Sequence, residues 1–374
     1  MKVALVCDDL IQHGGHERVI MEFCSLFPDA PVYTTAVSRK WRKVCEEKGI
    51  KLITTFVQKL PFIEKLSRYY APFMIYIFAL QGFDFSQYDL VISLSSRFAH
   101  GIVTKPQTLH ICYMSTPGRM FWEPKTYFKE ETFGFLESLK PLALVFLIIP
   151  LHLIRLWDFT AAQRVDYFIC NSLTTQKRIA KYYKRDSKII YPSIDISKFA
   201  DLQTSDKGFF LVITRLVSWK KVDIAIEACK KLQIKLKIIG TGPDESRLKS
   251  LANGSSAIEF LGYVLEERKL TELAGCTALV NTQLEDFGIV PLEAMAAGKP
   301  VIAYGKGGVL ETVIPTVTGE FFNDQTASAL VDVLKGFNPD RYKHEDCKDQ
   351  AKKFDKSVFQ RCILEDINHV LRLN

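Results

Sequence analysis

Residues 285–300 read Glu-Asp-Phe-Gly-Ile-Val-Pro-Leu-Glu-Ala-Met-Ala-Ala-Gly-Lys-Pro. Two carboxylates, Glu285 and Glu293, stand eight positions apart on either side of a glycine. The second opens an Ala-rich helix that is predicted to end at Gly298, before a buried strand. The free backbone N–H groups and the positive dipole end at a helix start suit a phosphate. One carboxylate on each side of that phosphate is then available to hydrogen-bond sugar hydroxyls.

Length and composition predict a globular protein of two domains. A chain of 374 residues is longer than one hydrophobic core usually supports. Apolar residues make up 48% and charged residues 24%, which are ordinary values for a globular protein. The net charge of +7 favours anionic partners such as nucleotide diphosphates or phospholipid surfaces. Nucleic acid is not expected as a partner, because no arginine-rich tract or aromatic–basic interleaving is present.

Cysteines and apolar runs indicate a cytoplasmic protein, with the inner face of a membrane as one further location. The nine cysteines include no Cys-x-x-Cys pair, which favours buried thiols in a reducing compartment and no zinc site. Met1–Cys7 is predicted to be a buried strand and not a signal peptide. The run Leu142–Ile154 has 13 residues, fewer than the ~18 of a spanning helix. We expect either a core helix or a membrane-surface helix there.

Short apolar runs alternate with amphipathic segments, which indicates parallel sheets covered by helices. The predicted strands of the first half are Lys2–Cys7, Leu90–Leu94, His110–Met114, Tyr167–Cys170 and Lys188–Tyr191. Those of the second half are Phe209–Thr214, Lys235–Ile239, Ile258–Leu261, Ala278–Val280 and Val301–Tyr304. The predicted helices are His16–Leu26, Ser172–Tyr183, Val222–Lys231, Asp244–Ala252, Glu266–Ala274, Pro291–Ala297, Thr326–Lys335 and the amphipathic tail Lys356–Leu371. Pro192–Asp206 suits a linker, so we expect domains at 1–195 and 196–355.

Three further loops carry groups that suit a phosphate. Gly14 and Gly15 precede a predicted helix, where a backbone can approach a phosphate closely. Arg215 and Lys220 follow a predicted strand, and a guanidinium with an ammonium neutralises a pyrophosphate well. Gly240 and Gly242 follow another strand. For each loop a tight turn or a solvated basic loop is an alternative explanation.

The opening stretch resembles the Glu-x7-Glu signature of retaining glycosyltransferases of family 4. The spacing, Gly288, Pro291 and the Ala-Gly-Lys-Pro run carry this resemblance together. It implies the α/β GT-B fold, with two Rossmann-like doubly wound domains around a cleft. It also implies that the C-terminal helix, residues 356–374, packs back on the N-terminal, acceptor-side domain. The donor in this family is a nucleotide sugar bound mainly by the second domain.

The resemblance assigns roles to individual residues. Glu285 would lie beside the transferred sugar, and Glu293 would hold the ribose hydroxyls. Arg215 and Lys220 would stabilise the departing diphosphate as catalytic residues. The remaining donor-binding residues would act through backbone groups or line the donor site: Gly14, Gly15, Gly240, Gly242, Tyr263, Phe287, Gly288, Ile289 and Val290. In the family a glycine commonly follows the lysine, whereas Lys221 occupies that position here.

Residues 111–122 resemble the Cys-Tyr-x-His-Thr-Pro-x-Arg-x-x-Trp stretch of a mannosyltransferase-like branch. Arg119 matches the arginine of that stretch, but Ser115 stands where the family has histidine. The match continues at Asn171-Ser172, so Ser115, Arg119 and Ser172 are acceptor-side candidates. His100 is a further candidate, with a purely structural histidine as the alternative. The departure at Ser115 puts activity or acceptor choice in question.

The resemblance implies transfer of a hexose, with mannose from GDP-mannose as first choice, to a glycan or lipid-linked sugar in polysaccharide or glycoconjugate synthesis. No cofactor or metal is expected, because no Asp-x-Asp motif is present. UDP-sugars are the second choice for the donor. A non-catalytic relative that binds nucleotide sugars, or another GT-B enzyme such as an epimerase, would also fit the resemblance. Leu136–Trp157, with Lys140 and Arg155, would make any peripheral membrane contact.

Overall fold

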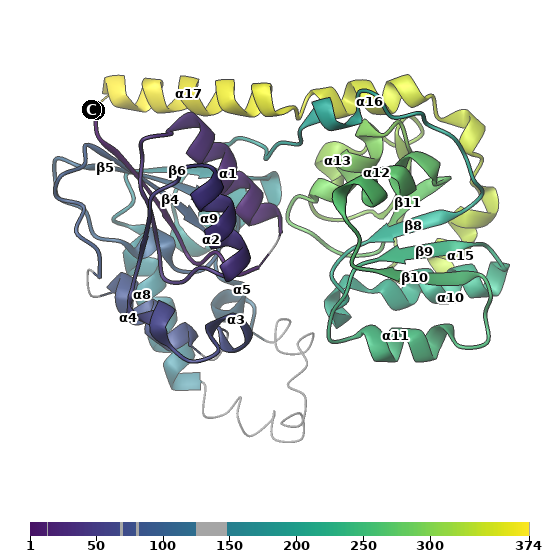
Figure 1. Cartoon of the computed structure of the whole chain (residues 1–374), viewed down its shortest axis with the longest axis horizontal. Helices are drawn as coiled ribbons and strands as arrows, with labels where there is room; N and C mark the ends of the chain where they lie inside the picture. Colours follow the sequence, from purple (N-terminus) through teal and green to yellow (C-terminus); the bar gives the residue numbers. More distant parts are fainter. Residues whose placement is uncertain (13, 68–69, 80–81, 125–147, 374) are drawn as a thin grey trace. The chain divides into compact units, whose positions relative to one another are not determined.

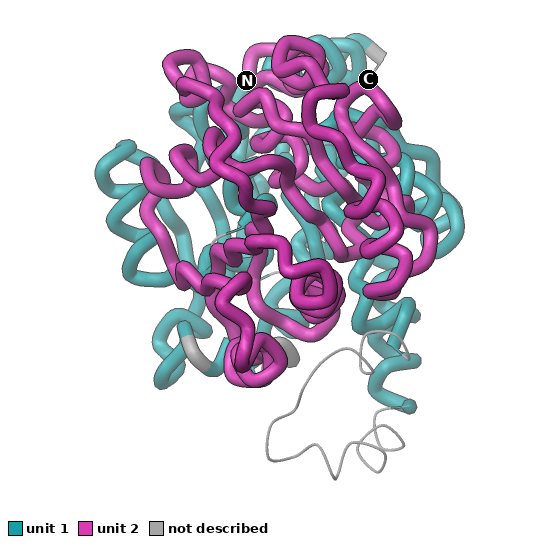
Figure 2. The backbone as a smooth tube through the Cα atoms, turned by 90° about the vertical axis from the view of Figure 1, so that its right-hand side faces the viewer, with its two compact units in different colours: residues 1–128, 133–191, 360–374 teal, residues 129–132, 192–359 magenta. Residues whose placement is uncertain are grey.

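The computed structural model describes residues 1–373 apart from 13, 68–69, 80–81 and 125–147. The described residues form two compact α/β units (Figures 1 and 2). Unit 1 takes the residues up to 191 and those from 360 onward, and unit 2 takes 192–359. Helix α17 (Lys356–Leu373) therefore begins in unit 2 and continues in unit 1, as the fold class predicted.

Unit 1 is built on a sheet of seven parallel strands in the order β3-β2-β1-β4-β5-β6-β7. Their bounds are β1 Val3–Cys7, β2 Val32–Thr34, β3 Leu52–Thr54, β4 Leu90–Ser95, β5 Leu109–Met114, β6 Tyr167–Cys170 and β7 Lys188–Ile189. The apolar runs predicted β1 and β4 to β7. They did not predict β2 and β3, which are three residues each and too short to show a pattern.

Helices surround this sheet. They are α1 Gly15–Leu26, α2 Arg39–Glu47, α3 Ile63–Leu66, α4 Ala71–Ala79, α5 Arg119–Trp122, α8 Ile148–Ala162 and α9 Leu173–Tyr183. Helix α1 forms because Val19, Ile20 and Phe23 recur at helical spacing and bury one face. Residues 142–147 of the run Leu142–Ile154 lie outside the described residues, and its remainder lies in α8. None of the described helices has the length and apolar character needed to cross a membrane.

Unit 2 has six parallel strands in the order β10-β9-β8-β11-β12-β13. The strands are β8 Phe210–Ile213, β9 Leu236–Ile239, β10 Ile258–Gly262, β11 Ala278–Asn281, β12 Val301–Tyr304 and β13 Gly319–Phe322. The helices are α10 Val222–Leu232, α11 Glu245–Ala252, α12 Glu266–Gly275, α13 Ile289–Ala296, α14 Val309–Thr312, α15 Ala327–Gly336 and α16 His344–Lys352. Two doubly wound units are thus confirmed. The edge strand β13 was not predicted.

The strand order of each sheet reverses next to its first strand. In unit 1 this switch point lies between β1 and β4, and in unit 2 it lies between β8 and β11. Ligands of open α/β sheets bind beyond the carboxyl ends of the strands at such a point. Gly14 and Gly15 follow β1, Arg215 follows β8, and Glu285 follows β11. The topology therefore places these candidate residues at the two switch points.

Asp8 fixes the switch point of unit 1. It follows β1, is almost fully buried, and accepts hydrogen bonds from the backbone N–H groups of Ser96, Arg97, Phe98 and Ala99 at 2.7–2.9 Å. Burial acts to raise the pKa of Asp8, but the charge of Arg97 and these N–H groups lower it overall. The ionised carboxylate thus ties the loop after β4 to the end of β1.

Candidate active site

Lys220 is a buried cation at the end of the loop that follows β8. The loop continues into a single 3-10 turn, Ser218–Lys220, and only 8% of Lys220 is exposed. Its Nζ lies 4.1 Å from the centre of the Trp219 ring, which is a cation–π distance. Lys221 adopts φ 54°, in the left-handed region. Glycine, which the family resemblance implies at this position, would take that conformation without strain.

Lys220 forms an ion pair with Glu285, which unit 2 brings in from the loop after β11. The backbone N–H of Gly308 donates to the Glu285 carbonyl oxygen at 2.9 Å and fixes that loop. Burial lowers the pKa of Lys220, and the nearby Glu285 carboxylate opposes this shift. Arg215 is close enough to lower the pKa of Lys220 further, and its own side chain is exposed. The arrangement combines a buried and an exposed cation, which suits a diphosphate.

Gly288 joins the Glu285 loop to helix α13. It has φ 93°, a conformation that favours glycine, and a Cβ there would lie 3.0 Å from Glu285 Oε2. The N–H groups of Ile289 and Val290 belong to the first turn of α13, where no intrahelical acceptor is available to them. The Phe287 side chain is buried, with its ring centre 5.9 Å from that of Phe354. Phe287 thus anchors the loop, and its predicted backbone contact with a ligand stays a prediction.

Glu293 is buried on α13 and has a cationic partner that the sequence did not reveal. Lys269 Nζ of α12 lies 3.0 Å from Glu293 Oε1 and 3.1 Å from Glu266 Oε2. Only 3% of Glu293 is exposed. A buried carboxylate keeps its charge more readily beside such an ammonium. The predicted contact with ribose hydroxyls stays a prediction, and Lys269 is the group that would orient Glu293 for it.

Gly240 and Gly242 hold the Arg215 loop in place. A Cβ on Gly240 would lie 1.8 Å from the Thr214 carbonyl oxygen, and one on Gly242 would lie 2.1 Å from that of Leu216. The Leu216 N–H donates to the Thr241 carbonyl oxygen at 3.0 Å. Close backbone packing therefore requires both glycines, whether or not they also contact a donor.

Tyr263 follows β10 and is 67% exposed, so its ring is accessible to a ligand. Its predicted place in the donor site stays a prediction. Among the described residues, no group of three His, Cys, Asp or Glu side chains is arranged to hold a metal ion.

His16 is a polar group at the unit 1 switch point that the sequence analysis did not select. Gly14 is the N-cap of α1, Gly15 begins the helix, and both are exposed. His16 Nδ1 lies 2.9 Å from Ser115 Oγ, so the serine in the motif position contacts a histidine in the first turn of α1. His16 Nε2 is buried and has no hydrogen-bond partner among the described residues. Burial lowers the pKa of His16, which keeps the imidazole neutral near pH 7.

Two acceptor-side candidates are buried in unit 1. His100 is fully buried, with Nε2 3.1 Å from Asp158 Oδ1 and Nδ1 3.0 Å from Ser95 Oγ. Ser172 is also fully buried and caps α9 by accepting a hydrogen bond from the Thr175 N–H at 3.1 Å. Both side chains thus have structural partners, and their acceptor-side roles stay predictions. Arg119 is partly exposed and pairs with Glu123 on α5 at 3.4 Å.

Comparison with known families identifies unit 2. Residues 193–354 match the family described as glycosyl transferases group 1. The match supports the predicted resemblance to glycosyltransferases for this part of the chain, and assignment to family 4 stays a prediction.

Curated relatives cover part of the chain. An uncharacterised glycosyltransferase of Methanocaldococcus jannaschii is 28% identical over 54% of this chain and 59% of its own length. The alpha-1,3/1,6-mannosyltransferase ALG2 of Dictyostelium discoideum is 30% identical over 47% of this chain and 52% of its own length. This chain thus spans about half the length of the curated relatives it matches.

Solved structures resemble the whole chain. Anabaena HepE in complex with UDP has a TM-score of 0.71 at 18% identity, covering 99% of this chain and 100% of that one. Sucrose-phosphate synthase of Thermosynechococcus elongatus has a TM-score of 0.70 at 15% identity, with both chains covered fully. At such identities the similarity shows the fold, which is the two-domain GT-B fold.

Proposed function

We propose that this protein, whose second unit is a group 1 glycosyltransferase domain, is a retaining, metal-independent glycosyltransferase. It transfers a hexose from a nucleotide sugar to a glycan or a lipid-linked sugar. The observation that carries the proposal is the ion pair of buried Lys220 with partly exposed Glu285, beside exposed Arg215, at the switch point of unit 2. A buried ammonium is costly to maintain, and an anionic ligand would stabilise it.

Each residue of unit 2 has a role in this proposal. Lys220 and Arg215 stabilise the negative charge that develops as the diphosphate departs. The N–H groups at the start of α13 bind the phosphate side of the donor, and Glu285 lies beside the transferred sugar. Glu293, oriented by Lys269, binds the ribose. No residue is assigned as a nucleophile, because the donor's own phosphate accepts the acceptor proton on the same face as the departing group.

Mannose from GDP-mannose is the first choice of donor. Its support is the resemblance of residues 111–122 to a mannosyltransferase-like branch, together with relatives named alpha-1,3/1,6-mannosyltransferase. UDP-sugars are the second choice, because HepE was crystallised with UDP and with UDP-glucose.

A transfer assay without metal tests the proposal. The purified protein is incubated in EDTA with GDP-mannose or UDP-glucose and with saccharide or lipid-linked acceptors, and proton NMR reads the anomeric configuration of the product. We expect an α-linked product from GDP-mannose. A β-linked product would contradict retention, and activity only after adding a divalent metal would contradict metal independence. Absence of transfer from every donor would contradict the proposed glycosyltransferase activity.

Membrane contact is part of the proposal for a lipid-linked acceptor. Ile149, Leu153 and Leu156 are exposed at helical spacing on α8, where an amphipathic face can lie in a membrane interface. Flotation with liposomes containing anionic phospholipid tests this part. Protein that stays at the bottom of the gradient would contradict the proposed membrane contact.

A further inference from the structure

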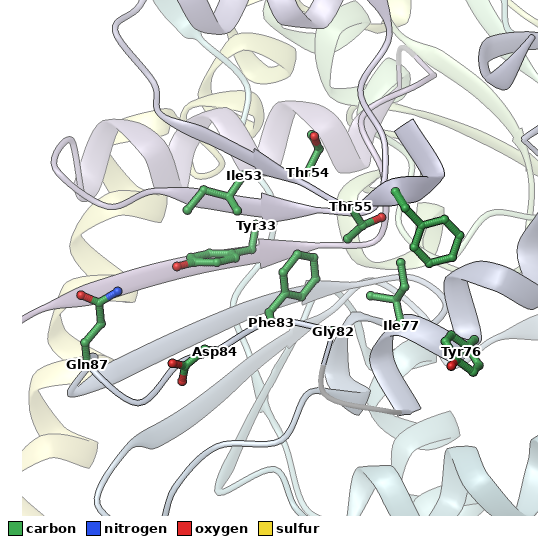
Figure 3. Close-up of a pocket in the computed structure, with 11 residues that line it drawn as sticks. Tyr33, Ile53, Thr54, Thr55, Tyr76, Ile77, Gly82, Phe83, Asp84 and Gln87 are labelled. Carbon is green, nitrogen blue, oxygen red and sulfur yellow. The ribbon is translucent and has the colours of Figure 1, made fainter. Parts of the chain in front are cut away.

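Unit 1 contains a cavity that shares no residue with the candidate active site. It has a volume of about 610 Å³, within the range of roughly 300–1,000 Å³ typical of small-molecule sites. Its walls come from β2, β3, the 3-10 turn Phe56–Lys59, α4 and the segment leading to β4 (Figure 3). The residues at the switch point come from other loops. A ligand here would therefore be bound apart from the reacting groups.

Aromatic rings give the cavity a rigid apolar surface. Tyr33 and Phe83 are nearly buried, and their ring centres are 5.3 Å apart in an edge-to-face arrangement. The Tyr33 hydroxyl is 2.9 Å from that of Tyr88, which fixes the ring further. Tyr76 also lines the cavity and exposes 57% of its surface. Rings held in this way present apolar faces without a further entropic cost on binding.

The polar groups of the cavity are acidic or neutral. Asp84 and Gln87 lie at the end opposite Tyr76 (Figure 3). Asp84 Oδ1 accepts a hydrogen bond from the Ser86 N–H at 2.8 Å. That bond lowers the pKa of Asp84, so the carboxylate is ionised at neutral pH. No lysine or arginine is among the described residues that line the cavity. A phosphate or nucleotide would meet the Asp84 carboxylate without any cation to neutralise it, and an acyl chain would leave the polar groups of Asp84 and Gln87 without hydrogen-bond partners.

We propose that this cavity binds a sugar unit of the acceptor glycan, at a distance from the site of transfer. A C–H face of a pyranose ring packs on the exposed Tyr76 ring, while the buried rings of Tyr33 and Phe83 form the rigid apolar wall behind it. The sugar hydroxyl groups donate to Asp84 and exchange hydrogen bonds with Gln87. The inference rests on the proposed function for the identity of the glycan. It adds a second point of attachment, through which longer acceptors gain affinity.

Saturation-transfer NMR without nucleotide tests the site directly. Mannotriose and maltotriose are the saccharide probes, and decanoate and pyrophosphate are the comparison ligands. Tyr76→Ala and Asp84→Asn remove one apolar face and one acceptor. Both side chains are exposed, so folding should persist. Phe62→Ala and Glu46→Gln are matched controls at exposed positions that do not line the cavity.

We expect a trisaccharide to bind the wild type, with Kd raised about fivefold to tenfold in each cavity variant and within twofold of wild type in the controls. Absence of saccharide binding, equal binding by the cavity variants, or displacement of the sugar by decanoate or pyrophosphate would overturn the inference. Transfer activity without saccharide binding at the cavity would reject the cavity site alone. Saccharide binding at the cavity without transfer from any donor would instead reject the proposed function.

Discussion

The switch points of the two units carry their polar groups in different ways. In unit 2, Lys220 and Glu285 are both motif residues, and the structure pairs them directly. In unit 1, the motif position holds Ser115, and the imidazole beside it comes from His16 in the first turn of α1. The motif residues of unit 2 therefore contact one another, whereas the motif serine of unit 1 contacts a residue outside its motif.

The comparison suggests different sensitivities to substitution. Unit 2 should lose activity sharply when one charge is removed, because its ion pair is buried. Unit 1 should show smaller, coupled effects, because a hydroxyl positions a neutral imidazole. We therefore expect the largest effect at Lys220 and the smallest at Lys221.

Removing the buried cation is expected to have the largest effect. Lys220→Ala should lower kcat by about 10²–10³-fold, because it removes a group that stabilises the departing diphosphate. Initial rates at saturating donor give the value. Lys221→Ala is the matched control, since it removes the neighbouring lysine, and it should stay within about threefold of wild type. Equal losses in both variants would show that no specific role belongs to Lys220.

The His16–Ser115 contact should be coupled. We expect His16→Ala to lower kcat/KM by about 10–100-fold, as for other positioned polar groups. Ser115→Ala should lower it less, because the imidazole remains. The double variant should be no worse than His16→Ala, which a double-mutant cycle measures. Losses of kcat/KM that multiply in the double variant would show that the two side chains act independently. Wild-type rates in both single variants would show that neither side chain contributes to transfer.

The pH dependence of the free energy of unfolding should reveal the titration of Glu17, which follows His16 in the sequence. Burial raises the pKa of Glu17 from 4.5 to about 7. Near pH 6 the folded state then holds a proton on Glu17 that the unfolded state releases. The contribution of this proton to the free energy of unfolding is fully present below pH 4.5 and is lost as the pH rises through 7. The shift corresponds to about 3 kcal/mol of unfolding free energy.

Glu17→Gln should therefore reduce the loss of stability between pH 5 and pH 8, as measured by denaturant unfolding at both values. Glu46→Gln, at an exposed glutamate, is the control and should leave the loss unchanged. An unchanged pH dependence in Glu17→Gln would place the titrating group elsewhere.

The smallest effect is expected at Lys221. Lys221→Gly should raise the free energy of unfolding by about 1 kcal/mol, because a non-glycine residue in the left-handed region is strained. Thermal unfolding of unit 2 gives the value, and kcat should change little. Destabilisation by this substitution would show that contacts of the lysine side chain outweigh the strain.

Much of the fold was predictable, because buried parallel strands appear as apolar runs bounded by turn residues. Strands β2 and β3 have three residues each, and the edge strand β13 begins with a glycine and a glutamate, so none of the three shows such a run. The position of Arg215, Lys220 and Glu285 after predicted strands was also readable from the sequence, but their assigned roles came from the family resemblance and stay predictions.

The remaining site residues depended on tertiary structure. Lys269 and His16 reach Glu293 and Ser115 from other elements, and no local pattern predicts such contacts. His100 and Ser172 were placed on the acceptor side because they are polar and lie near motif residues. Both are fully buried, which the sequence does not show, and their acceptor-side roles stay predictions.

Calorimetric titration in EDTA tests most directly whether unit 2 binds a nucleotide sugar. The ligands are GDP, GDP-mannose, UDP and UDP-glucose, and the proteins are the wild type, Glu293→Gln and the surface control Glu46→Gln. The account predicts selective binding of GDP and GDP-mannose by the wild type and the control, with Kd raised about tenfold or more in Glu293→Gln. Selective UDP binding would overturn the donor assignment. No binding of any of the four ligands would contradict the central claim.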